Sequence, residues 1–212
     1  MKTIDAKMET ELIVSDDDLH TYEIIKRLVG VEGESGYLIS LYPTRNKENI
    51  FSNDSTMNHI VSHMAELGFN ELHIINLFSK VVQGKMSVRG LQIDSENMQY
   101  LDCLMADKKF QDSKLVIAWG NSMLTSQAVK DSKSEVFAMF KKYCPKNKLY
   151  QLSPIGQKVD STIAPHPLYL GIRAADATWG LQEFRLTDKM IQKKPKPEMI
   201  IIQSCDSKKK KQ

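Results

Sequence analysis

The residues most suited to chemistry in this chain follow short apolar segments, at the points where strands would end. They are Tyr42, Arg45 and Asn46 after one segment, Asn76 within the end of a second, Trp119 and Asn121 after a third, and His166 after a fourth. In an open parallel sheet, ligands bind beyond the carboxyl ends of the strands. Because that topology would bring all these side chains to one edge, we expect them to form one binding site.

These residue types suit a ligand that carries a nucleobase and a phosphate. The amide of Asn76 has donors and an acceptor, which matches the edge of a base. The guanidinium of Arg45 can clamp a phosphate or a carboxylate. His166 lies between two prolines, which hold the backbone extended and stiff. Such rigidity suits a placed acid or hydrogen-bond donor.

Each candidate also has a structural explanation. Asn76 interrupts an apolar strand and could satisfy a neighbouring loop, and His166 could be a structural histidine. Arg45 could form a surface ion pair, and Trp119 could belong to the core. Asp54 precedes an apolar helical pattern, where a helix N-cap is its simplest role.

A pair of histidines also has the spacing of metal ligands on a helix. His59 and His63 are four residues apart, with Glu66 nearby. They lie opposite the apolar positions of the expected helix, so a solvated face is the favoured interpretation. The sequence has no phosphate-binding glycine loop, no C-x-x-C and no G-x-S-x-G motif. We expect neither a metal nor a cofactor.

The elements that would position these residues alternate along the chain. Strands are predicted at 22–29, 37–42, 72–78, 114–119 and 149–152, with helices between Asp54 and Gly68, at 95–105 and at 122–143. This alternation predicts a three-layer α/β/α fold with a mainly parallel central sheet. The first two strands flank a glycine-containing turn and are expected to form an N-terminal hairpin. Residues 178–186 suggest a short helix, and 199–202 suggest an edge strand or a partner contact.

Length and composition favour a single domain. The chain has 212 residues, of which 42% are hydrophobic and 26% charged, as in ordinary globular proteins. We expect a weakly ordered segment at 1–18, one α/β domain at 19–188 and a Lys-rich tail at 189–212. No apolar run could cross a membrane, and the N-terminus lacks an apolar signal segment. Three widely spaced cysteines favour a reducing, cytoplasmic location.

The basic character of the chain is concentrated in the expected tail. Residues 189–212 carry a net charge of +6, and the remainder carries −3. The run from Lys208 to Lys211 could contact phosphates of a nucleic acid or could be a solvated terminus.

The order of the motifs resembles the domain of unknown function 1643 family of bacterial and phage proteins. The matching segments are 38–43, 53–56, 74–78, 95–97, 118–120 and 166–170. The last of these, His-Pro-Leu-Tyr-Leu, is the most specific. The family commonly has Asn before the first proline, where this chain has Tyr42. This resemblance identifies relatives and implies no reaction.

The same positions are more distantly similar to the uracil-DNA glycosylases. Those enzymes have an Asp-Pro or Asn-Pro, an Asn that reads uracil, a Trp-Gly and a His-Pro at four successive strand ends. The corresponding positions here are Tyr42-Pro43, Asn76, Trp119-Gly120 and His166-Pro167. The resemblance implies a glycosylase-like fold with a base pocket, in which His166 supports the departing base.

Tyr42 departs from the glycosylase pattern at the position that orients the attacking water. Tyrosine cannot act as a carboxylate base. Asp54 could take this role if its loop brings it near, so His166 and Asp54 are the catalytic candidates. The other candidates, Tyr42, Arg45, Asn46, Asn76, Trp119 and Asn121, would bind substrate.

Two functions of different classes follow. The first is a nucleobase- or nucleotide-directed protein, acting on nucleic acid or a free nucleotide, that either hydrolyses an N-glycosidic bond or binds a base without cleaving it. An enzyme that acts on a small nucleotide-like metabolite is a related alternative. The second is a non-catalytic interaction protein, phage or defence related, that binds a protein or nucleic-acid partner. The sequence shows no basic channel outside the tail, which counts against tight DNA binding.

Overall fold

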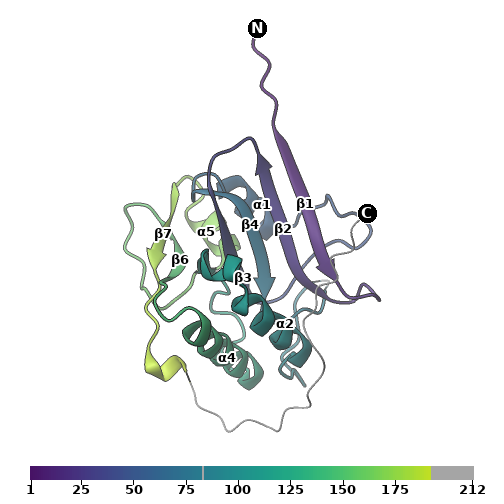
Figure 1. Ribbon diagram of the computed structural model, residues 1–212, viewed down its shortest axis with the longest axis vertical. Coiled ribbons are helices and arrows are strands. Elements are labelled where there is room, and N and C mark those ends of the chain that lie inside the picture. The colour runs from purple at the N-terminus through teal and green to yellow at the C-terminus, as the bar shows by residue number, and fades with distance from the viewer. Residues whose placement is uncertain (83, 192–212) are drawn as a thin grey trace.

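The structure is a computed structural model that describes residues 1–82 and 84–191. Seven strands form one sheet in the order β1-β2-β4-β3-β5-β6-β7 (Figure 1). They span Lys7–Val14 (β1), Thr21–Val29 (β2), Glu34–Ser40 (β3), Phe69–Asn76 (β4), Lys114–Ile117 (β5), Leu149–Pro154 (β6) and Trp179–Glu183 (β7). The apolar segment 199–202, and the Lys-rich tail beyond residue 191, lie outside the described residues.

The sheet is mixed. The four central strands, β4, β3, β5 and β6, run parallel. On either side of them, β2, β1 and β7 pair antiparallel with their neighbours. A mainly parallel sheet is therefore not confirmed. Helical segments connect the four central strands, and a short turn joins β1 to β2 and reverses the chain. At the other edge, β7 follows the helix α5 and still runs antiparallel to β6.

The N-terminal hairpin differs from the predicted one. The sequence predicts pairing between the strands now seen as β2 and β3, but β4 lies between them. The hairpin is instead β1–β2, with Lys7 opposite Val29. Residues 7–14, predicted to be weakly ordered, form β1. Its residues are exposed or only partly buried because it is an edge strand, whereas β3 and β4 contain runs of buried residues.

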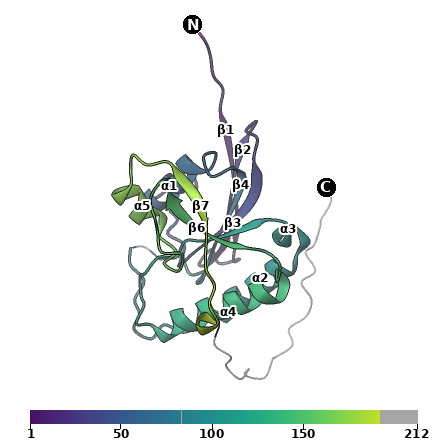
Figure 2. The ribbon, with the colours of Figure 1, turned by 90° about the vertical axis from the view of Figure 1, so that its left-hand side faces the viewer.

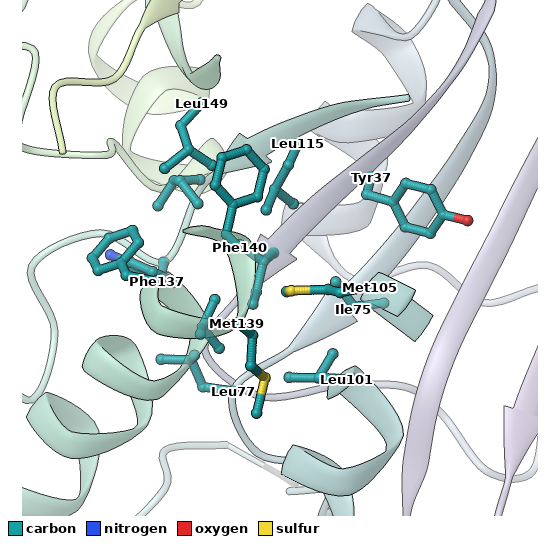
Figure 3. Packing of buried hydrophobic residues seen from close by; sticks show 14 of the residues in the cluster. Tyr37, Ile75, Leu77, Leu101, Met105, Leu115, Phe137, Met139, Phe140 and Leu149 are labelled. Carbon is teal, nitrogen blue, oxygen red and sulfur yellow. The ribbon is translucent and has the colours of Figure 1, made fainter. Parts of the chain in front are cut away.

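Helices cover both faces of the sheet. α1 (Ser55–His63) and α5 (Pro167–Arg173) pack on one face, and α2 (Ser95–Ala106), α3 (Lys108–Gln111) and α4 (Gln127–Tyr143) pack on the other (Figure 2). Alternate strand residues divide between two apolar cores. In β3, Tyr37 faces the core under α2 and α4 (Figure 3). Ile39 belongs to the same core, and Leu38 faces the core under α1. A short 3-10 helix, η1 (Asp188–Met190), follows β7.

The C-terminal part corrects two predictions. The helix predicted at 178–186 is instead β7, whose Trp179 is fully buried and pairs with Pro154 of β6. The face of α1 that carries His59 and His63 is not solvated, because it packs on β7 and α5. The His63 ring stacks on Trp179 with centroids 3.9 Å apart. The carboxylate of Glu66 accepts a hydrogen bond from the backbone N–H of Trp179.

Across the described residues, no helix has both the length and the apolar character that crossing a membrane requires.

Candidate functional site

A cavity of about 700 Å³ opens at the carboxyl ends of the parallel strands. It extends from there along the face covered by α1, where β1 and β2 form part of its wall. Six of the predicted site residues line it: Tyr42, Arg45, Asp54, Asn76, Trp119 and His166. The cavity therefore lies where strand topology places ligand sites in α/β proteins.

Two predicted site residues lie outside the cavity lining. The side-chain oxygen of Asn46 accepts hydrogen bonds from the backbone N–H groups of Glu48 and Asn49, at 2.9 and 3.2 Å, and so closes a local turn. Asn121 is exposed in the turn after β5. Both residues lie in the loops just beyond a strand end, where sequence position alone does not fix the direction of a side chain.

Asn76 forms part of the cavity floor. It is the last residue of β4, it pairs with Ser40 of β3, and it is only 2% exposed. Within the described residues, its side-chain amide makes no hydrogen bond, while its backbone carbonyl accepts one from the amide of Asn97 at 2.8 Å. The buried hydroxyl of Ser40 also lacks a partner there. Buried polar groups are normally hydrogen-bonded, so this floor is suited to a polar ligand.

Asn97 is a positioning residue that sequence reasoning did not single out. It is fully buried near the start of α2, and its amide fixes the end of β4 through the Asn76 carbonyl. Asp94 caps the same helix by accepting the Asn97 backbone N–H. The signal in the sequence was the Ser95-Glu96-Asn97 motif, which matched a family pattern without indicating a contact.

His166 is held in one orientation at the cavity wall. It is the N-cap of α5, and its Nδ1 accepts the backbone N–H of Leu168 at 3.2 Å. In the neutral ring, Nε2 therefore carries the proton and is a hydrogen-bond donor. Burial lowers the pKa of this imidazole, and the nearby charge of Asp54 partly opposes that shift. The lowered pKa favours the neutral imidazole.

Close backbone contact fixes the His166 loop. The N–H of Gly120 donates to the Ala164 carbonyl at 2.9 Å. Gly120 has a φ of +63°, and a Cβ atom there would lie 2.9 Å from the Cβ of His166. The buried side chain of Gln151 in β6 accepts the Ala164 N–H at 3.0 Å and donates to the Asp160 carbonyl at 2.8 Å. Only glycine permits this approach between the loops after β5 and β6.

Asp54 is the N-cap of α1, as its sequence position suggests. One carboxylate oxygen accepts the Met57 backbone N–H at 2.7 Å, and the other accepts the hydroxyl of Thr44. Each oxygen retains a second lone pair. The residue is thus first a helix cap, although it lines the cavity and lies near enough to His166 to influence its pKa.

Arg45 is tied to the start of β2. Its Nε donates to the Thr21 hydroxyl at 2.7 Å, and its guanidinium forms an ion pair with Asp18. The side chain is 10% exposed, so the ion pair is partly buried. Arg45 therefore presents a fixed, already paired cation to the cavity.

Trp119 belongs to both the core and the cavity wall. It is 4% exposed and packs edge-on against Phe137, with centroids 5.3 Å apart. The ammonium of Lys133 lies 5.0 Å from the centre of its ring. Burial lowers the pKa of Lys133 to about 8. Tyr42 contributes a second, partly buried aromatic ring to the wall.

Sequence reasoning missed Lys26. This residue of β2 lines the cavity and is 2% exposed. Its ammonium donates to the Thr10 hydroxyl at 3.0 Å and to the Asn53 side-chain oxygen at 3.1 Å. Burial lowers its pKa. The sequence signal for Lys26 was its position two residues after Ile24, which places both side chains on the same, inward face of β2.

Metal ligands are not grouped in the part of the chain that the structure describes. No set of three His, Cys, Asp or Glu side chains there could hold a metal ion. His63 uses its Nδ1 to donate to the His59 carbonyl at 2.8 Å.

Comparison with known proteins identifies the family. No curated protein and no solved structure is detectably similar to the chain. A family model described as "Protein of unknown function (DUF1643)" matches residues 24–168, from β2 to the first turn of α5. That match covers well over half of the chain and includes every predicted site residue, so the protein belongs to the DUF1643 family.

Proposed function

We propose that the cavity binds a nucleobase, carried by a nucleotide or a nucleic acid, in a glycosylase-like site. The observation that carries this proposal is the free amide of Asn76 on a floor that is almost fully buried. An amide that the described residues leave unpaired would satisfy its donors and acceptor on a ligand. The glycosylase-like order of strand-end motifs around one cavity further supports it.

The polar groups of the cavity match one class of base. The Asn76 amide can pair with an adjacent N–H and C=O on a ring, and Nε2 of His166 can donate to a carbonyl oxygen. The rings of Trp119 and Tyr42 offer apolar surface for the base. This combination favours a keto base such as uracil or thymine over an amino base.

The same geometry supports hydrolysis of an N-glycosidic bond. As a base departs, negative charge builds on its carbonyl oxygen, and a neutral His166 that donates a hydrogen bond stabilises that charge. Asp54 retains lone pairs that could orient a water, whereas Tyr42 supplies no carboxylate.

Replacing Asn76 tests the proposal. Asn76→Leu removes the amide at similar size, so base affinity should fall by roughly 1–3 kcal/mol. The melting temperature should change little, since the amide has no partner among the described residues. Calorimetric titration with free bases and nucleosides, together with thermal unfolding, measures both effects.

Asn97→Leu is the matched control. Its amide hydrogen-bonds the Asn76 carbonyl, so this change should lower the melting temperature. If no base or nucleoside binds the wild type, or if Asn76→Leu binds them equally well, the cavity is not a nucleobase site.

One observation favours the second class, an interaction protein. Tyr169 and Ile172 on α5 are 58% and 67% exposed, just after His166. Large exposed apolar side chains that lie together are typical of partner surfaces. Tyr169→Ser with Ile172→Ser should leave base binding intact and abolish association with a protein partner if α5 serves that role.

A further inference from the structure

Lys26 is a buried cation for which the described residues provide no ionic partner. Buried charges in proteins are normally paired with an opposite charge. The two partly buried arginines follow this rule, because Arg27 pairs with Glu71 and Arg45 pairs with Asp18. Lys26 is more deeply buried than either, and its two hydrogen-bond partners, Thr10 and Asn53, are neutral.

The position of Lys26 connects it to the base site. It lines the same cavity as Asn76 and His166, in the part bounded by β1, β2 and the loop before α1. An ammonium has three donors, and two of them are used. The third can reach a ligand in the cavity. Asn53 and Thr10 themselves carry donors that could complete the coordination of an oxyanion.

We propose that Lys26, Thr10 and Asn53 form an oxyanion subsite that binds the phosphate of a mononucleotide. The identity of the ligand as a nucleotide rests on the proposed function, whereas the anion site stands on the geometry of Lys26. The cavity volume of about 700 Å³ is within the range that encloses a whole small ligand, and it exceeds the space that a base alone requires.

The depth of the subsite selects a terminal phosphate. Lys26 is 2% exposed, so a group that contacts it must enter the cavity. An internal phosphodiester carries a chain on both sides and would need two exits from this position. A phosphate monoester needs only one. The subsite therefore favours a free nucleotide over a base flipped out of a polymer.

The experiment compares Lys26→Met with Lys47→Met. Met keeps the length of the side chain and removes its charge, and Lys47 is an exposed lysine of the loop before α1 that does not line the cavity. Affinities for uridine, uridine 5′-monophosphate, inorganic phosphate and a short single-stranded oligonucleotide are measured at constant ionic strength. The wild type and Lys47→Met should bind the monophosphate roughly ten- to hundred-fold more tightly than the nucleoside.

Lys26→Met should lose this preference and should retain nucleoside binding. Its melting temperature without ligand should stay close to that of the wild type, because relief from an unpaired buried charge offsets the loss of the hydrogen bonds to Thr10 and Asn53. An unchanged melting temperature would show that the variant loses phosphate affinity without unfolding.

The remaining outcomes separate the two proposals. Equal affinity of the wild type for nucleoside and monophosphate, or an unchanged preference in Lys26→Met, overturns the subsite. If the wild type binds the oligonucleotide more tightly than the monophosphate, and Lys26→Met loses this preference, then the subsite does not select a terminal phosphate. Inorganic phosphate could stabilise the wild type but not Lys26→Met, while no nucleoside binds either protein. That result supports the subsite and overturns the nucleobase function.

Discussion

The His166 imidazole depends on a single backbone hydrogen bond for its tautomer. Nδ1 must be unprotonated to accept the Leu168 N–H, so protonation of the ring both removes this bond and adds charge beside the base site. Burial already disfavours the charged form and lowers the pKa. Ligand binding and stability should therefore respond to pH in the same direction.

We expect acid to weaken the protein through His166. Its folded pKa lies below the usual 6.5, so as the pH falls through 6.5 the unfolded chain takes up the proton first. Stability from this group is intact above pH 6.5 and decreases below it. His166→Asn keeps a side-chain acceptor for the cap and removes the titration, so its melting temperature should fall less between pH 7 and pH 5. Parallel curves for the two proteins would contradict this assignment.

Lys26 and Asn76 show what the sequence reveals of single residues. Asn76 stands out because it interrupts an apolar run, so its burial at a strand end was predictable. Lys26 lies beside Arg27 in a strand that also contains Glu23. The pairing of β2 with β1 and β4 decides which of these charges faces the cavity. The sequence did not predict that β1 or β4 would be the neighbour of β2. A residue whose role depends on register cannot be assigned before the register is known.

At the scale of elements, the cavity is built where two loops meet closely. The turn after β5 and the loop after β6 touch through Gly120 and His166. The carbonyl of Gly120 also accepts a hydrogen bond from Lys133 of α4 at 3.3 Å. The position of the histidine is thus set by a glycine more than forty residues earlier in the chain.

Gly120→Ala should displace His166. The substitution combines a left-handed φ with a Cβ contact of 2.9 Å, so it should lower both the unfolding free energy and the affinity for a base. Gly156→Ala is the control, because its φ is +80° but nothing lies within 4 Å of the added Cβ. The control should cost only the backbone strain, roughly 1–2 kcal/mol, with base affinity unchanged. Equal effects of the two variants on binding would show that the Gly120 contact does not position the histidine.

Element prediction succeeded where burial is two-sided. The central strands β3, β4 and β5 contain near-continuous apolar runs, and the helices α1, α2 and α4 contain apolar residues at helical spacing. The edge strands differ. In β1, every residue is exposed or only partly buried, and β7 has only five residues, of which Trp179 alone is buried. Such segments become strands because a neighbour pairs with them, which sequence periodicity does not record.

At the scale of the whole molecule, the edge hairpin is part of the binding site. Thr10 and Leu12 of β1 line the cavity together with Lys26 of β2. The edge strand therefore supplies functional groups in addition to covering the backbone of β2. The first 23 residues lie outside the part matched by the DUF1643 model, so the contribution of β1 extends the site beyond that matched region.

Removing residues 1–14 should damage both stability and phosphate binding. The deletion exposes the hydrogen-bonding edge of β2 and takes away the Thr10 hydroxyl. We expect a lower melting temperature, weaker affinity for a nucleoside monophosphate and a tendency to self-associate, measurable by light scattering. Removal of residues 1–6, which precede β1 and are exposed, is the control and should change none of these. Full stability and affinity after the longer deletion would refute the role of β1.

The strand order also has a consequence for synthesis of the protein. β3 lies between β4 and β5, and both of these follow it in the chain. While the ribosome is still making the first hundred residues, the apolar strand β3 lacks its neighbour β5, whose last residue is Ile117. Non-local pairing of this kind slows folding and leaves apolar strands exposed to aggregation. Expression at low temperature or with chaperones should therefore raise the yield of folded protein, since β3 stays unpaired on one side until β5 has been translated.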